Sequence, residues 1–231
     1  MADFHQNHDN ISTHVVTVGQ VYNEFSSGGQ DVAAIRDFAR LNYEKSLADS
    51  SEFNYLLLMG DASYDYKNRL TNNTNFVPVY EGGSFLNLQS SFITDDFFAY
   101  LDPSEGNVNN SFNGEVMDIG VGRIPVVSQS EAFSYINKVK QYTTANNRFG
   151  DWRNRVLLMA DDVDVVTGWE TIFVTESEVL QNIINNRSKA FNINKIYEDA
   201  YTQVSTTGSE SYPEASDDMF RQVQQGNLVT N

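Results

Sequence analysis

Short, continuous apolar runs separated by longer amphipathic stretches are the feature that most constrains the fold of this chain. Two runs, Tyr55–Met59 (YLLLM) and Val156–Ala160 (VLLMA), have the length of a strand and show no alternation of polar and apolar residues. Such strands bury both faces, which is typical of parallel sheets covered by helices on both sides. We therefore expect an α/β protein with a parallel sheet and flanking helices.

The rest of the chain continues this alternation. Four more strands are predicted from apolar runs, at His14–Val18, Val116–Val121, Ile193–Tyr197 and Leu228–Thr230. Three helices are predicted from apolar residues at helical spacing, at Asp31–Leu47, Ser130–Tyr142 and Thr175–Asn185. The region from 68 to 113 is irregular and rich in Asn, Gly and Ser, and we expect it to contain short strands near Phe76–Tyr80 and Phe97–Leu101.

A pattern of a buried strand followed by acidic residues occurs twice. Tyr55–Ser63 and Arg155–Val163 share it, and their first residues lie 100 positions apart. This spacing indicates two α/β units. We place the first in residues 1–148 and the second in residues 149–231.

Charge and hydropathy exclude some classes of partner. Fifteen Lys and Arg stand against 31 Asp and Glu, and the net charge of −16 disfavours nucleic acid and anionic membrane surfaces. No apolar stretch reaches the length of about 20 residues that a membrane span needs. The N-terminus has neither the basic nor the apolar region of a signal peptide.

Acidic residues gather at the predicted carboxyl ends of strands, where open α/β sheets bind ligands. Hard cations such as calcium prefer several oxygen ligands, and the candidate ligands here are Asp61, Asp95, Asp96, Asp161, Asp162 and Asp164. The alternative is that these carboxylates cap helices and lie in solvated loops.

Two further sets of residues bear on catalytic chemistry. Asp162 and Asp164 follow an apolar strand with the Asp-x-Asp spacing of magnesium-dependent phosphotransferases, in which the first Asp attacks phosphorus and the second acts as acid and base. The chain has no cysteine, and its three histidines, His5, His8 and His14, lie at the N-terminus. A Ser-His-Asp or Cys-His site cannot therefore be assembled in the middle of the chain.

Several longer motifs resemble the gingipain-type cysteine peptidases, and they occur in that family's order. They are Val21–Asp31, Leu57–Lys67, Phe76–Pro78, Thr94–Phe98, Asp118–Pro125, Phe149–Asn154, Ala160–Asp162 and Ala200–Ser205. The resemblance runs from about residue 15 to the end of the chain and is strongest to the family's type IX secretion sortase branch.

The resemblance implies a caspase-like parallel sheet with two side-by-side subdomains, of which the second is incomplete here. It also implies a cysteine endopeptidase that cleaves C-terminal sorting domains of secreted cargo. Its substrate would be a protein or peptide, its partners other outer-membrane secretion components, and its location secreted or at the bacterial cell surface.

The chain departs from the family pattern at the catalytic residues. Gly226–Asn231 resembles the strand that leads into the family's Gly-His-Gly motif, and neither that histidine nor the later cysteine is among these residues. No catalytic role can be carried over, so we expect the isolated chain to be inactive. A non-catalytic scaffold or binding module with the same fold is the alternative.

Overall fold

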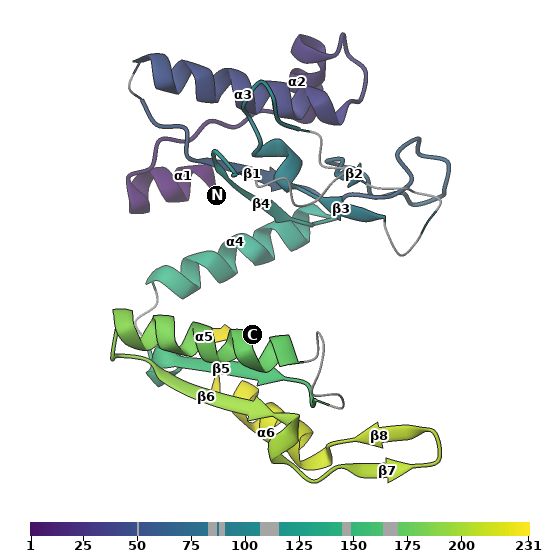
Figure 1. Ribbon diagram of the computed structural model, residues 1–231. Helices are drawn as coiled ribbons and strands as arrows, with labels where there is room; N and C mark the ends of the chain where they lie inside the picture. Colours follow the sequence, from purple (N-terminus) through teal and green to yellow (C-terminus); the bar gives the residue numbers. More distant parts are fainter. Residues whose placement is uncertain (50, 83–86, 88–90, 107–115, 145–148, 164–170) are drawn as a thin grey trace. The chain divides into compact units, whose positions relative to one another are not determined.

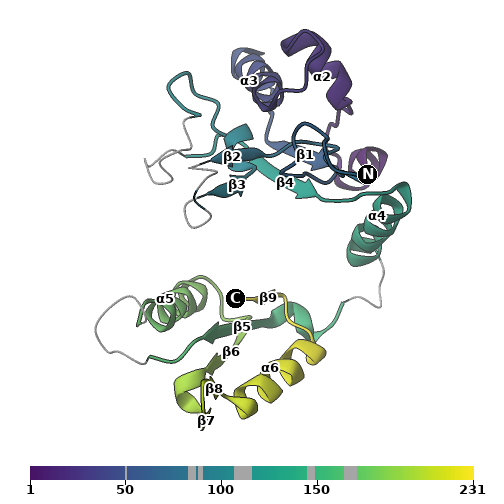
Figure 2. The same ribbon diagram turned by 90° about the vertical axis from the view of Figure 1, so that its right-hand side faces the viewer.

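A computed structural model describes residues 1–231 except 50, 83–86, 88–90, 107–115, 145–148 and 164–170. The chain divides into two compact units, Met1–Gln141 and Tyr142–Asn231 (Figures 1 and 2). The sequence placed this boundary slightly later, between residues 148 and 149.

The first unit contains a parallel strand pair, a short antiparallel pair and several helices. Its elements are α1 (Ala2–Phe4), the π-helix η1 (His5–Asp9), α2 (Val18–Phe25), α3 (Val32–Asp49), β1 (Tyr55–Met59), β2 (Tyr80–Gly82), β3 (Phe92–Thr94), the 3₁₀ turn η2 (Asp96–Phe98), β4 (Gly120–Ile124) and α4 (Gln129–Thr144). Strands β1 and β4 run parallel, with Tyr55 opposite Gly120 and Met59 opposite Ile124. Strands β2 and β3 run antiparallel.

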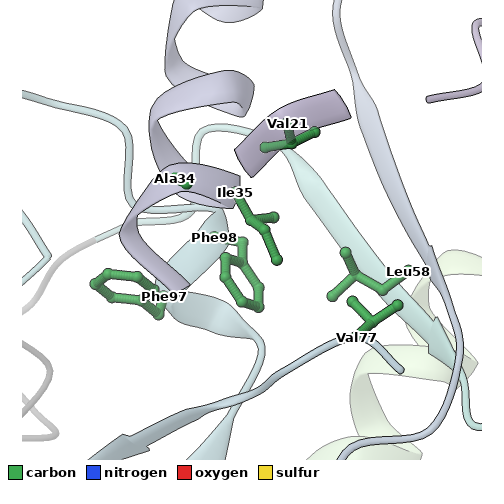
Figure 3. Packing of buried hydrophobic residues seen from close by; sticks show 7 residues of the cluster. All are labelled: Val21, Ala34, Ile35, Leu58, Val77, Phe97 and Phe98. Carbon is green, nitrogen blue, oxygen red and sulfur yellow. The ribbon is translucent and has the colours of Figure 1, made fainter. Parts of the chain in front are cut away.

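Side chains from helices, a strand and the irregular region meet in the core of this unit. The cluster consists of Val21, Ala34, Ile35, Leu58, Val77, Phe97 and Phe98, and Figure 3 shows Ile35, Leu58, Val77 and Phe98 facing a common space. Phe98 is completely buried and lies in the same cluster as Ile35 of α3 and Leu58 of β1. This cluster attaches the irregular region to the end of the parallel pair.

The second unit is a parallel sheet with flanking helices and a projecting hairpin. Its elements are the 3₁₀ turn η4 (Asp151–Asn154), β5 (Arg155–Ala160), α5 (Thr171–Arg187), β6 (Asn192–Tyr197), the 3₁₀ turn η5 (Glu198–Ala200), β7 (Val204–Thr206), β8 (Ser209–Ser211), α6 (Pro213–Gln225) and β9 (Val229–Thr230). The sheet order is β6-β5-β9, and both neighbours run parallel to β5. Leu157 in the central strand is completely buried and lies in a cluster with Ile196 and Ala215.

Most predicted elements are confirmed. The run Tyr55–Met59 is β1, and the runs at 156–160, 193–197 and 228–230 correspond to β5, β6 and β9. The three predicted helices correspond to α3, α4 and α5; α4 and α5 extend beyond their predicted bounds at both ends, and α3 begins one residue later and ends two residues later than predicted.

The strand predicted at His14–Val18 is wrong, because helix α2 begins at Val18. The Thr17 side chain accepts a hydrogen bond from the Gln20 amide, and the Gln20 side chain accepts one from the Thr17 amide at 2.8 Å. This reciprocal pair is a capping box, which satisfies free amides at the start of a helix. Its Thr-x-x-Gln spacing is visible in the sequence and outweighs the β-branched run before it.

The expectations for the irregular region and β4 also need correction. Phe97–Leu101 is not a strand, because Asp96–Phe98 forms a 3₁₀ turn that buries Phe97 and Phe98 together, whereas consecutive strand residues point to opposite faces. The strand expected at Phe76–Tyr80 begins only at Tyr80. The strand expected at Val116–Val121 instead spans Gly120–Ile124.

Candidate functional site

The carboxyl ends of β5 and β6 bring three acidic side chains together. These strands are parallel and in register from Arg155 opposite Asn192 to Ala160 opposite Tyr197. The residues that follow them, Asp161, Asp162 and Glu198, therefore emerge at the same edge of the sheet. A carboxylate oxygen from each lies within 4.8 Å of the others.

Hydrogen bonds hold the loops that carry these carboxylates. The Tyr212 hydroxyl, just before α6, donates to Asp162 Oδ2 at 2.6 Å. The Gln203 side chain in turn donates to the Tyr212 hydroxyl oxygen at 3.0 Å. The Val163 amide donates to Asp199 Oδ1 at 3.3 Å. The Tyr212 hydroxyl, itself held by Gln203, thus fixes the position of the Asp162 carboxylate.

The three carboxylates repel one another. Burial raises the pKa of Glu198, and a hydrogen bond with Asp161 and the charges of Asp161 and Asp162 raise it further. Across the described part of the chain, no Lys or Arg forms an ion pair with any of the three. The cluster therefore has no basic partner among the residues that the structure describes.

This donor set fits a hard cation. Calcium binds six to eight oxygens, and carboxylates can coordinate through one or both of theirs. Glu198 was not a predicted ligand, although the sequence contained a signal for it. It directly follows a predicted strand, and parallel strands end at one edge of a sheet.

The remaining predicted ligands lie elsewhere or outside the described residues. Asp61 follows β1, and its Oδ2 accepts a hydrogen bond from the Thr74 hydroxyl at 2.5 Å. Asp95 is paired with Arg123, and Asp96 is exposed at the start of η2. Among the residues that the structure describes, these three join no group of metal-binding side chains. Asp164 lies outside the described residues.

Arg123 lies near the carboxyl end of β4 in the first unit and bonds to several segments there. Its guanidinium donates to both carboxylate oxygens of Asp95, at 2.7 and 2.8 Å. It also donates to the carbonyl oxygens of Gly60, Val77 and Pro78 at 2.6–3.1 Å. All five N–H donors of an arginine are thereby used. The end of β1 and the irregular region are joined through this one side chain, which the sequence analysis did not single out.

The family model described as peptidase family C25 matches residues 1–231. No curated protein matches the chain. No helix of the described residues is long and apolar enough to cross a membrane.

Three solved structures are similar to the chain. The dimeric latent PorU from Porphyromonas gingivalis is 29% identical over 61% of this chain and 14% of its own, with a TM-score of 0.50. The Arg-specific cysteine proteinase gingipain R is 18% identical over 87% of this chain and 39% of its own, with a TM-score of 0.53. The complex of RgpB pro- and mature domains from Porphyromonas gingivalis is 17% identical over 95% of this chain and 41% of its own, with a TM-score of 0.54.

The likeness to the two gingipain structures confirms the predicted fold, a caspase-like α/β architecture with parallel sheets and flanking helices. The chain spans less than half the length of each of these solved chains.

Proposed function

The chain belongs to peptidase family C25, and from this premise we propose that it forms part of the catalytic domain of a cysteine endopeptidase. The match of the family model over residues 1–231 carries the proposal. The two gingipain structures support it through the fold. The family also favours peptide hydrolysis over the phosphoryl transfer considered for Asp162 and Asp164.

Under the proposal, the two catalytic groups of the peptidase are not among the 231 residues of this chain. A cysteine peptidase needs a thiolate to attack the scissile carbonyl and an imidazole to protonate the leaving amine. This chain has no cysteine, and its histidines are confined to its first fourteen residues. Under the proposal, the chain supplies the sheets and the loops at their carboxyl ends, and the thiolate and imidazole come from elsewhere in the polypeptide.

The sortase branch is the finer proposal. The 29% identity to PorU over 61% of the chain supports it, together with the ordered motifs in the sequence. The substrates would then be the C-terminal sorting domains of type IX secretion cargo. The location would be the secreted fraction or the outer-membrane surface, and the partners would be other components of that secretion system.

Peptidase assays on two polypeptides test the proposal. We expect the 231-residue chain to show no thiol-dependent hydrolysis of unfolded protein or fluorogenic peptides, because it lacks the nucleophile. The polypeptide encoded by the complete open reading frame should hydrolyse them and be blocked by iodoacetamide. If this polypeptide folds and remains inactive, the scaffold alternative replaces the proposal.

We also propose that Asp161, Asp162 and Glu198 bind calcium. A ligand that binds only the folded state raises its stability by mass action. Millimolar calcium should therefore raise the melting temperature of the chain, and excess chelator should reverse the effect. Differential scanning calorimetry measures both.

Glu198→Gln is the informative variant for this cation site. The raised pKa of Glu198 means that the folded state holds its proton more tightly than the unfolded state. Repulsion in the cluster therefore reduces stability as pH rises above the ordinary value of 4.5. At pH 7 without calcium, Glu198→Gln should melt above the wild type, whereas with calcium its gain should be smaller than that of the wild type. An equal calcium response in both proteins would rule out this site.

A further inference from the structure

One carboxylate of the first unit is buried without a positive partner. Asp65 lies in the loop that follows β1 and is only 8% exposed. It is the only charged residue among the buried residues of the described chain. Within that part of the chain, no ion pair includes it. Because removing a charge from water is costly, buried carboxylates are almost always paired with a cation or bound to a metal ion.

The hydrogen bonds of Asp65 leave one of its carboxylate oxygens unused. Oδ2 accepts a hydrogen bond from the Leu70 amide at 2.6 Å. Oδ1 accepts none from the residues that the structure describes. Lys67 and Arg69 of the same loop are exposed, and neither forms an ion pair with Asp65. The loop's own basic residues therefore do not balance the charge of Asp65.

A second oxygen without a partner lies beside Asp65. The side-chain nitrogen of Asn73 donates to the backbone carbonyl oxygen of Asp65 at 2.8 Å. This bond fixes the orientation of the Asn73 amide, since only its nitrogen can donate. Asn73 Oδ1, on the same amide group, has less than 1 Å² of exposed surface and no hydrogen-bond partner. Two oxygen acceptors, one of them charged, thus lack a positive neighbour in one loop.

Further hydrogen bonds hold the loop in this shape. The Asp65 amide donates to Ser63 Oγ at 3.1 Å, and the Asn68 amide donates to the Asp65 carbonyl oxygen at 3.1 Å. The Ser63 amide donates to Asn75 Oδ1 at 3.2 Å. Asn75 Nδ2 is a buried donor without a partner, and a water molecule on a bound ion would supply the acceptor that it lacks. The exposed side chains of Tyr64 and Tyr66 flank Asp65, so the loop lies within reach of solvent ions.

We propose that the Asp65 carboxylate and Asn73 Oδ1 bind a calcium ion in the loop after β1. Calcium accepts carboxylate, amide and backbone carbonyl oxygens together with water, so one carboxylate among neutral oxygens suits it. The chain has no cysteine and this loop has no histidine, which are the ligands that zinc and copper prefer. The site lies in a different unit from Asp161, Asp162 and Glu198, and its binding requires neither that site nor peptidase activity.

A calcium titration followed by NMR tests the inference on the intact 231-residue chain. Calcium chloride should shift the backbone amide signals of residues 61–77 with a Kd of about 0.1–1 mM, the range of calcium sites with few charged ligands. Signals of residues 160–200 report on the second unit in the same titration, so the two sites are measured separately. Magnesium chloride should shift residues 61–77 less, because magnesium gives up its water molecules reluctantly.

Three variants identify the ligands. Asp65→Asn keeps an acceptor for the Leu70 amide but removes the charge, and it should weaken binding at least about 10-fold, since even the partners of metal ligands commonly contribute that much. Asn73→Asp adds a charged ligand and should tighten binding several-fold. Asp37→Asn, at an exposed position of α3, changes the net charge as Asp65→Asn does and should leave binding unchanged.

Three results would overturn the inference. The first is a calcium titration that leaves the signals of residues 61–77 in place. The second is an Asp65→Asn variant that binds calcium as the wild type does, which would mean that the carboxylate is not a ligand. The third is equal weakening by Asp65→Asn and Asp37→Asn, which would mean that only the net charge matters. Since these measurements record binding alone, a peptidase-inactive polypeptide or a failed cation site in the second unit would leave them unaffected.

Discussion

Replacing Arg123 by Met should lower the free energy of unfolding of the first unit by about 3–5 kcal/mol, the cost of removing one partner from a buried ion pair. The pair is well enclosed, since the side chains of Arg123 and Asp95 are only 12% and 22% exposed. The variant would leave the Asp95 carboxylate without its cation. It would also remove the donors that now satisfy the carbonyls of Gly60, Val77 and Pro78.

The geometry of the guanidinium, and not its charge alone, should account for most of this loss. A lysine at this position carries the same charge but has three donors at a single point, so it cannot reproduce the two-pronged contact with a carboxylate. Arg123→Lys should therefore recover only part of the stability lost in Arg123→Met. Full recovery would show that charge alone is sufficient.

Arg40→Met is the matched control. Arg40 forms an ion pair with Glu44 one helical turn away at 2.8 Å, and the two side chains are 31% and 54% exposed. Exposed pairs of this spacing contribute about 0.3–0.5 kcal/mol. If Arg123→Met lowered the free energy of unfolding as little as Arg40→Met does, Arg123 would not be what joins the end of β1 to the irregular region.

Urea unfolding followed by two signals measures these variants. Both tryptophans, Trp152 and Trp169, belong to the second unit. Tryptophan fluorescence therefore reports on that unit, whereas far-UV circular dichroism reports on both. We expect Arg123→Met to move the dichroism transition to lower urea and to leave the fluorescence transition close to that of the wild type.

The sequence predicted both apolar strands, but the expected burial of both faces is confirmed only for β5, because Tyr55, Leu57 and Met59 of β1 are exposed. The apolar runs of β1 and of the central strand β5 are sufficient to predict these strands, because continuous apolar runs of that length favour parallel strands. The apolar run His14–Val18 does not predict helix α2, whose signal in the sequence is the Thr-x-x-Gln spacing of its capping box. Where a capping-box spacing and a short apolar run predict different structures for the same residues, the capping box is the stronger evidence.

The site was predicted only in part, for a reason that lies in the topology. Asp161 and Asp162 were predicted from their position after a strand. Their partner Glu198 lies 36 residues after Asp162, and it reaches them only because β5 and β6 are neighbours in the sheet. Asp95 was considered a cation ligand, yet a protein cation, Arg123, already occupies both of its oxygens. The position of Glu198 after a predicted strand indicates its edge of the sheet, but which side chains lie beside it, and that Arg123 lies beside Asp95, depends on the order of the strands.

Replacing Leu157 by Ala should lower the free energy of unfolding of the second unit by about 2–5 kcal/mol, the usual cost of removing a buried leucine side chain. Leu157 is completely buried in the central strand, between Asn194 of β6 and Thr230 of β9. The Leu157 side chain projects from one face of the sheet and lies in a cluster with Ile196 and Ala215, so its removal leaves a cavity among packed side chains. In contrast to Arg123→Met, this variant should move the fluorescence transition.

Leu57→Ala is the control for this effect, since Leu57 is also the third residue of a parallel strand, β1, but is 47% exposed. Its loss should stay below about 1 kcal/mol, because a half-exposed side chain gives up little burial and leaves no closed cavity. Equal losses at the two leucines would mean that Leu57 is covered in solution. A fluorescence transition unchanged by Leu157→Ala would mean that the second unit does not depend on its central strand, contrary to the packing of Ile196 and Ala215 around it.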